Sequence, residues 1–191
     1  MNKKQIGPST RLFPMPALLV VVKTGKKEAN ILTIAWGGIL AGGPPIIGIA
    51  VGKNHYSTPF LRNEGNFSVN IPHSQQDVQA DYCGTMSGAN DPNKASTCGF
   101  TLVPSTLISS PLIGECPINF ECKTYKEMEF KGSILFMGEV VETHVSESVL
   151  DEQGKIVSEK LDPLIFLPNG EYWRIGSFVS KAFSVGKALH K

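Results

Sequence analysis

The stretch NILTIAWGG, residues 30–38, is the most informative part of the chain. Its apolar and β-branched residues predict a strand, yet two polar side chains, Asn30 and Thr33, stand at positions that otherwise look buried. An amide and a hydroxyl on such a strand are suited to hydrogen-bond a flat heteroaromatic ring, and Trp36 offers that ring an apolar contact. A core position is the alternative for Trp36, and the stretch alone does not choose between the two.

A second polar segment follows the next predicted strand. Residues 51–58, VGKNHYST, form a loop with one cation, Lys53, and clustered hydroxyls, and Thr58-Pro59 is typical of a helix start. Backbone N–H groups at that start, with Lys53 and Ser57 or Thr58, are suited to hold a phosphate. Helix capping is the alternative role of both hydroxyls.

The glycines near these segments do not form the common nucleotide-binding motifs. A phosphate-binding loop around Gly52-Lys53 needs Gly at position 47 and Ser or Thr at position 54, where Ile47 and Asn54 stand. The pairs at 37–38 and 42–43 do not make a dinucleotide fingerprint either. Because no nucleophile motif or convincing acid–base pair occurs, we expect a bound cofactor to carry any chemistry, and we predict no catalytic side chain.

Composition favours one globular domain over residues 1–191, with 41% hydrophobic and 18% charged residues. Eighteen basic residues against 17 acidic ones, without a basic stripe, disfavour nucleic acid and anionic membrane surfaces as partners. The longest apolar run, residues 17–22, is far shorter than the ~20 residues of a membrane helix. Prolines at 14 and 16 and lysines at 23, 26 and 27 do not fit a signal peptide, so we expect a cytoplasmic protein.

The cysteines and histidines do not follow a metal-binding pattern. Four cysteines stand at 83, 98, 116 and 122 without a Cys-x-x-Cys pair, and the four histidines are scattered. We therefore expect reduced, mostly buried thiols and no metal site. A cysteine-based redox sensor is a further hypothesis, and it requires an exposed thiol with a low pKa.

Short β-rich segments bounded by Gly, Pro, Asn or Asp dominate the chain. The predicted strands are residues 17–23, 31–36, 46–51, 67–71, 118–125, 134–145 and 172–175. The predicted short helices are residues 59–63, 74–82 with Gly84 as the stop signal, a turn from Asp91-Pro92 to Gly99, and 177–184. Within 118–123 the alternation predicts one solvent-exposed strand face. This pattern indicates a mainly β protein, an antiparallel barrel with helical insertions rather than a doubly wound parallel sheet.

Several short motifs follow one another along the chain from about Thr10 to Lys187. They are Asn30 with TIAWGG at 33–38, Pro44-Pro45, Lys53, Tyr56-Ser57, FSVNIP at 67–72, ADY at 80–82 with Gly84 and Ser87-Gly88, GEV at 138–140, and the segment 175–187. This ordered series resembles the flavin-reductase-like, FMN-binding split-barrel family, and most closely its flavoredoxin branch. The resemblance implies an antiparallel split β-barrel with a few short peripheral helices, assembled as a homodimer with one FMN per subunit near the interface.

The resemblance also implies roles for particular residues. The strand that meets the flavin carries Asn30, Thr33, Ala35 and Trp36, and the segment near the ribityl phosphate carries Lys53, Tyr56, Ser57 and Thr58. Lys94 resembles a lysine that reaches the cofactor, and Phe166 an aromatic that packs near the ring. A solvated loop lysine and a core phenylalanine are the alternatives. Because residues 131–133 lack a histidine and residues 40–41 lack a cysteine, the contacts that some relatives make there are not carried over.

The function that follows from this resemblance is an FMN-dependent oxidoreductase of the flavin reductase or flavoredoxin type. It would pass hydride or electrons from NAD(P)H or a redox protein through bound FMN. The alternative is a non-catalytic split-barrel module that binds another ligand or a partner protein.

Overall fold

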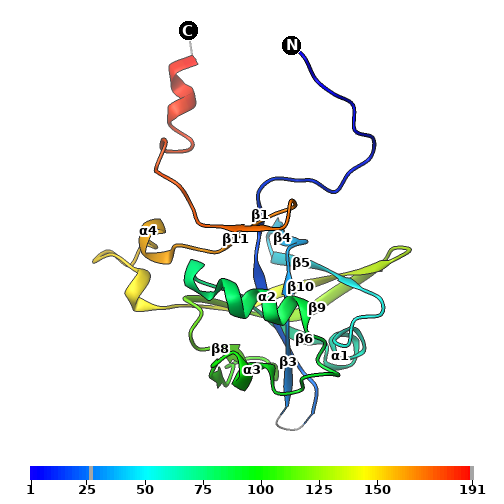
Figure 1. Ribbon diagram of the computed structural model, residues 1–191. Helices are drawn as coiled ribbons and strands as arrows, with labels where there is room; N and C mark the ends of the chain where they lie inside the picture. The colour runs from blue at the N-terminus through cyan, green and yellow to red at the C-terminus, as the bar shows by residue number, and fades with distance from the viewer. Residues whose placement is uncertain (26–27, 190–191) are drawn as a thin grey trace.

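A computed structural model describes residues 1–25 and 28–189 (Figure 1). Its body is a seven-stranded antiparallel sheet in the order β3-β2-β6-β9-β10-β5-β4. These strands are β2 (Leu18–Lys23), β3 (Ala29–Ile34), β4 (Gly37–Gly42), β5 (Pro45–Gly52), β6 (Asn66–Ile71), β9 (Ile118–Glu129) and β10 (Ser133–Val145). The mainly β, antiparallel fold class is thus confirmed.

Smaller elements surround this sheet. Three short strands, β1 (Met15–Pro16), β11 (Ile165–Leu167) and β12 (Glu171–Trp173), form a second sheet, and β7 (Leu102–Val103) pairs with β8 (Leu112–Ile113). The helices are α1 (Thr58–Glu64), α2 (Asp77–Thr85), α3 (Lys94–Thr97) and α4 (Ser158–Leu161), with 3-10 turns at Ser74–Gln76, Glu147–Val149 and Val185–Leu189. None of the helices in the described part of the chain is long and apolar enough to cross a membrane.

A bend between β3 and β4 closes the sheet into a barrel. Only Ala35 and Trp36 separate the two strands, so one continuous segment pairs first with β2 and then with β5, at the opposite end of the sheet. The Trp36 carbonyl accepts a hydrogen bond from the Ala50 amide at 2.8 Å. A Cβ at Gly37 would lie 2.8 Å from Leu18 Cδ1 and 3.1 Å from the Gly48 carbonyl oxygen, so the bend favours glycine.

The core has two layers that share β2. Alternate residues of this strand, such as Val20, face the barrel interior, where Phe67 and Phe136 are fully buried. The intervening residues, such as Leu19, pack under α2 together with Ala80. Figure 1 shows α2 lying across this outer face of the sheet. Because β2 is buried on both faces, its side chains are almost all apolar.

The structure corrects two helix predictions. The helix α2 continues through Gly84 to Thr85, so Gly84 is not a stop signal. A Cβ at Gly84 would lie 3.2 Å from Thr33 Cβ, so the glycine instead permits close packing of α2 on β3. The expected helix at 177–184 is absent, and only the 3-10 turn Val185–Leu189 forms. This segment projects from the same side of the body as the N-terminal segment (Figure 1), and residues 177–189 are all exposed, so packing does not stabilise a helix there.

The prediction that the thiols are mostly buried is confirmed. Cys98 is half-buried and the other three are buried.

The prediction of one solvent-exposed face at 118–123 is wrong, because Glu121 is fully buried. Its carboxylate accepts hydrogen bonds from the Thr106 amide and hydroxyl and from the Leu107 amide, at 2.7–2.8 Å. His144 Nε2 lies 2.7 Å from the same carboxylate. Burial alone raises the pKa of Glu121, but these hydrogen bonds outweigh it and lower the pKa to about 2. Glu121 thereby anchors the 104–110 loop on β9.

Replacing this carboxylate should destabilise the fold. Glu121→Gln presents an NH2 group to backbone donors, so we expect the free energy of unfolding at pH 7 to fall by ~2–4 kcal/mol. The ionised carboxylate contributes fully above pH 4.5 and loses its contribution as the pH falls toward about 2. Urea unfolding at pH 7 and pH 3 measures both effects. The exposed Glu142→Gln is the control, and equal stabilities of the two variants would contradict the assignment.

Candidate functional site

A cleft of about 220 Å³ lies outside the barrel, between β3, the loop before α1 and the segment that follows α2. Its lining residues are Asn30, Leu32, Thr33, Asn54, His55, Tyr56, Ser57, Cys83, Gly84, Thr85, Met86, Ser87, Gly88 and Lys94. A neighbouring pocket of about 250 Å³ shares Thr33, Gly84 and Thr85 with it. Together these spaces match the size of small-molecule sites, which is about 300–1,000 Å³.

At one end of the cleft, a buried hydrogen bond joins the two polar segments singled out above. Asn30 Nδ2 donates to Ser57 Oγ at 2.6 Å. Ser57 precedes α1, yet its side chain does not cap the helix. Within residues 1–25 and 28–189, the amides of Tyr56 and Ser57 have no hydrogen-bond acceptor. This corner therefore offers free N–H groups beside a hydroxyl, which favours an anionic ligand.

Gly88 closes the cleft against this corner. A Cβ at this position would lie 2.5 Å from Tyr56 Cδ1 and would collide with Asn30 Oδ1. Only glycine permits such an approach, so the segment after α2 forms a fitted wall. The Tyr56 ring is held in turn by Phe60, with the ring centroids 5.2 Å apart.

Lys94 brings a buried cation to the cleft wall. Only 3% of the residue is exposed, so it is not a solvated loop lysine. Its Nζ donates to the carbonyls of Ile31 at 2.9 Å and Cys83 at 3.2 Å. Among the described residues, no carboxylate lies within 4.0 Å of this ammonium. Burial lowers the pKa of Lys94, as expected for a cation whose charge is incompletely compensated.

Thr33 of β3 and the bend residues Ala35 and Trp36 follow Asn30 along the chain. Thr33 Oγ1 donates to the Ala80 carbonyl at 2.5 Å, which ties β3 to α2. Ala35 lines the neighbouring pocket, and Trp36 lines an apolar groove with Pro14 and Pro16. Trp36 is 52% exposed, so it is not a core aromatic.

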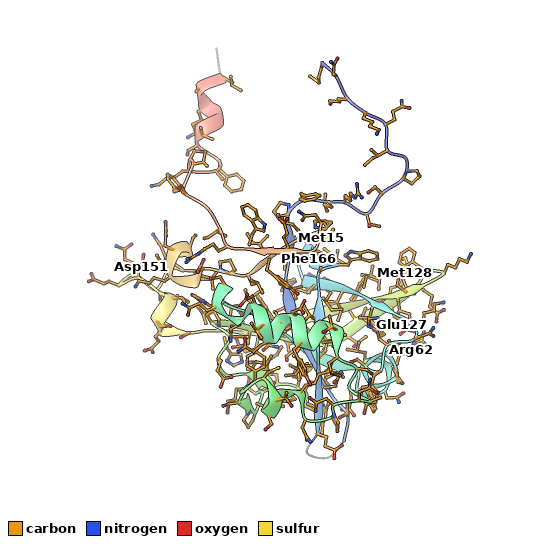
Figure 2. All side chains as sticks on the ribbon, viewed as in Figure 1. Met15, Arg62, Glu127, Met128, Asp151 and Phe166 are labelled. Atoms are coloured by element: carbon orange, nitrogen blue, oxygen red, sulfur yellow. The ribbon has the colours of Figure 1, made fainter. Side chains whose placement is uncertain are left out.

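Phe166 lies in the neighbouring pocket, beside Met15 (Figure 2). Its ring centroid is 5.9 Å from that of Tyr172, whose hydroxyl donates to Asp81 Oδ1 at 3.3 Å. Burial raises the pKa of Tyr172 to about 12, so the phenol stays protonated. The half-buried Phe166 is thus a wall of the site rather than a core residue.

Besides Trp36, which lines only the separate groove, two predicted residues line neither the cleft nor the neighbouring pocket. Lys53 Nζ pairs with Glu129 at 2.9 Å on the surface, in the same ion-pair network as Arg62 and Glu127, which Figure 2 shows side by side. The Thr58 hydroxyl donates to the Gly52 carbonyl at 2.8 Å, so it has no proton to offer a phosphate. Local sequence placed both near Ser57, but the turn before α1 directs them elsewhere.

Other cleft residues were not singled out from the sequence. Asn54 and His55 lie in the polar segment 51–58, so the sequence pattern that identified this segment also indicates them. Ser87 belongs to the Ser87-Gly88 motif quoted for the resemblance, whereas Thr85 and Met86 enter the cleft only because the chain reverses after α2 and folds back over β3. Nothing in their residue types signals that reversal.

Comparison with known proteins agrees with this arrangement. Residues 10–173 match the model of the flavin reductase like domain. The flavoredoxin of Desulfovibrio vulgaris (Miyazaki F) is 35% identical, with a TM-score of 0.92 over 97% of this chain and 100% of that one. A flavoredoxin from Methanosarcina acetivorans is 32% identical, with a TM-score of 0.91 over 99% and 100%. An uncharacterised protein of Archaeoglobus fulgidus is 33% identical over 81% of this chain and 85% of its own.

The family model covers most of the chain, and the cleft contains Asn30, Thr33, Ser57 and the buried Lys94, which the family resemblance singled out. The chain therefore belongs to the flavin reductase-like family.

Proposed function

We propose that the cleft binds FMN and that the protein is an FMN-dependent oxidoreductase of the flavin reductase or flavoredoxin type. The observation that carries this proposal is the buried Lys94 ammonium, which has no carboxylate partner in the described chain and faces the cleft. A buried cation of this kind is stabilised by an electron-rich or anionic ligand. The four free thiols are consistent with the reducing cytoplasm that we propose as its location.

Different residues of the cleft would contact the ring and the phosphate of such a ligand. Asn30 and Thr33 of β3 and Ala35 of the following bend face the ring, and Lys94 compensates negative charge on it. The Tyr56 and Ser57 amides with the Ser57 hydroxyl hold the phosphate. Bound FMN supplies the hydride and electron transfer, which is consistent with the absence of a side-chain acid–base pair from the cleft.

The electron donor that we propose is NAD(P)H or a redox protein. The pocket walled by Phe166 and Tyr172 adjoins the cleft, so it offers space for a flat donor or acceptor next to a bound ring. Its lining is mainly apolar, with Asp81 held by Tyr172. That environment favours an uncharged ring over an anionic group.

An absorbance spectrum of the purified protein is the first test. Flavin bands near about 370 and 450 nm, with about one FMN released per chain on denaturation, would support the proposal. A colourless protein that ignores added FMN would instead favour a non-catalytic binding module.

Removing the buried charge should weaken binding. Lys94→Met keeps the side chain's length, and we expect the FMN dissociation constant to rise about ten- to hundredfold.

In the unsubstituted protein, the affinity for FMN should fall as the pH rises through the lowered pKa of Lys94, below 10.5, because the neutral amine no longer attracts the ligand. Lys94→Met should lack that step. Fluorescence titration across pH measures both, with the exposed Lys123→Met as control, and unchanged affinity in folded Lys94→Met would reject this role.

The phosphate assignment is tested by comparing two ligands. Ser57→Ala should weaken FMN binding about tenfold but change riboflavin binding by less than about threefold, because only FMN carries the phosphate. Loss of the Asn30 hydrogen bond affects both ligands alike, so the ratio of the two constants isolates the phosphate contact. Thr58→Val is the matched control, and it should lower stability without changing that ratio. Equal losses for both ligands in Ser57→Ala would count against the assignment.

We also propose a homodimer. The edge strand β4 exposes Ile39 and Leu40 by 66% and 53%, and an exposed apolar edge invites pairing. The hairpin of β9 and β10 carries further exposed apolar side chains, among them Met128, which projects from the body in Figure 2. The two terminal segments project separately from the same side of the body (Figure 1), and Phe178 and Phe183 are exposed on the C-terminal one.

A charge on β4 should disrupt this assembly. Ile39→Asp is expected to convert the dimer to monomer, as measured by size-exclusion chromatography with light scattering, because an aspartate desolvated in the interface has no partner. Val78→Asp replaces a similarly exposed apolar residue on α2 and should leave the dimer intact. A monomeric unsubstituted protein, or a dimer that tolerates Ile39→Asp, would contradict the proposal.

A further inference from the structure

Two cysteines lie at the base of the cleft wall. Cys83 Sγ, on α2, is 3.7 Å from Cys98 Sγ, which follows α3. A disulfide requires the sulfurs to approach to about 2.05 Å, and side-chain rotation with small backbone shifts covers a gap of this size. The proximity is not explained by a metal site, because the described residues hold no cluster of three or more metal-ligating side chains.

The segment between these cysteines forms the cleft wall itself. Six of the cleft-lining residues belong to it: Gly84, Thr85, Met86, Ser87, Gly88 and Lys94. Both cysteines also contact Lys94 through their backbones, because the Cys83 carbonyl accepts from Lys94 Nζ and the Cys98 amide donates to the Lys94 carbonyl at 2.9 Å. A covalent bond at this base would therefore restrain the wall and the buried cation together.

We propose that Cys83 and Cys98 form a reversible disulfide that staples the cleft wall and slows the release of bound flavin. The effect on flavin release rests on the proposed function, whereas formation of the disulfide does not. A loop restrained in the conformation that binds the ligand loses less entropy on binding, so the stapled form retains the ligand longer. Reduction of the bond restores the freely exchanging form.

The oxidant is a hydroperoxide, such as hydrogen peroxide. The Cys98 thiolate attacks one peroxide oxygen, the O–O bond breaks, and hydroxide leaves as Cys98 becomes a sulfenic acid. Cys83 sulfur then attacks Cys98 Sγ, the S–O bond breaks, and water leaves. The two thiols lose two electrons and two protons, and the peroxide becomes two waters. Cys98 reacts first because it is half-buried, whereas Cys83 is 1% exposed.

This reaction is slow, which separates it from a fast peroxide sensor. Burial raises the pKa of both thiols, so little thiolate is present near neutral pH. Such a bond accumulates under sustained oxidation and stays until a reductant removes it.

The test starts from the fully reduced, full-length protein as purified, with its flavin. Excess hydrogen peroxide should lower the intact mass by about 2 Da, and peptide mapping should place the bond between Cys83 and Cys98. Amide hydrogen exchange over residues 85–93 should slow about tenfold in the oxidised form, and FMN release about three- to tenfold. Dithiothreitol should reverse all three changes.

Two variants make the result specific. Cys98→Ser should abolish the mass change and keep the exchange and release rates of the reduced protein after peroxide treatment. Cys116→Ala, a buried thiol outside the pair, should behave like the unsubstituted protein. No disulfide, a bond between other cysteines, or a Cys83–Cys98 bond with unchanged exchange and FMN release would overturn the proposal. A bond that slows exchange in a protein unable to bind FMN would support the staple and reject the proposed function.

Discussion

The fold depends on one continuous segment, β3 followed by β4, that pairs with both ends of the same sheet. The β3–β4 segment pairs with β2, bends at Ala35–Trp36, and then pairs with β5, so the sheet has to close on itself. The bend is possible because Gly37 presents no side chain to Leu18. Closure fills the interior with apolar side chains, so a ligand has to bind outside the barrel, where polar β3 residues meet α2 and the loop before α1.

The two buried charged residues Glu121 and Lys94 differ in how completely their charges are compensated. Glu121 receives hydrogen bonds from a backbone loop and lies beside His144, and such a fully satisfied carboxylate stabilises the fold. Lys94 is held by two carbonyls but has no carboxylate partner in the described chain. An incompletely compensated charge costs stability, and it persists where a ligand completes its environment. The difference in compensation, rather than burial itself, separates the two roles.

The cleft is assembled from segments that are far apart in the chain. Asn30 and Ser57 are joined by a side-chain hydrogen bond, and Lys94 reaches the Ile31 carbonyl from α3. Gly88 completes the wall by packing against Asn30 and Tyr56. Since the segment from Cys83 to Cys98 supplies one whole wall, its rigidity bears directly on how firmly the cleft holds a ligand.

Local sequence patterns predicted six of the seven strands of the large sheet, the mainly β class and the polar positions on β3, because alternation, β-branched residues and turn formers act locally. They did not predict β4 (Gly37–Gly42), whose glycines are not typical of a strand. The family resemblance added Lys94 and Phe166 to the predicted site. By residue type alone, Lys94 would be expected in solvent and Phe166 in the core. The positions of Gly84 within α2, of the buried Glu121, and of Lys53 and Thr58 away from the cleft became evident from the folded structure. For Gly84, Glu121 and Lys53 the deciding partner is distant in the chain: Thr33, the 104–110 loop and Glu129, respectively. Local patterns cannot report such a partner, because long-range packing and hydrogen bonding choose it only when the chain has folded.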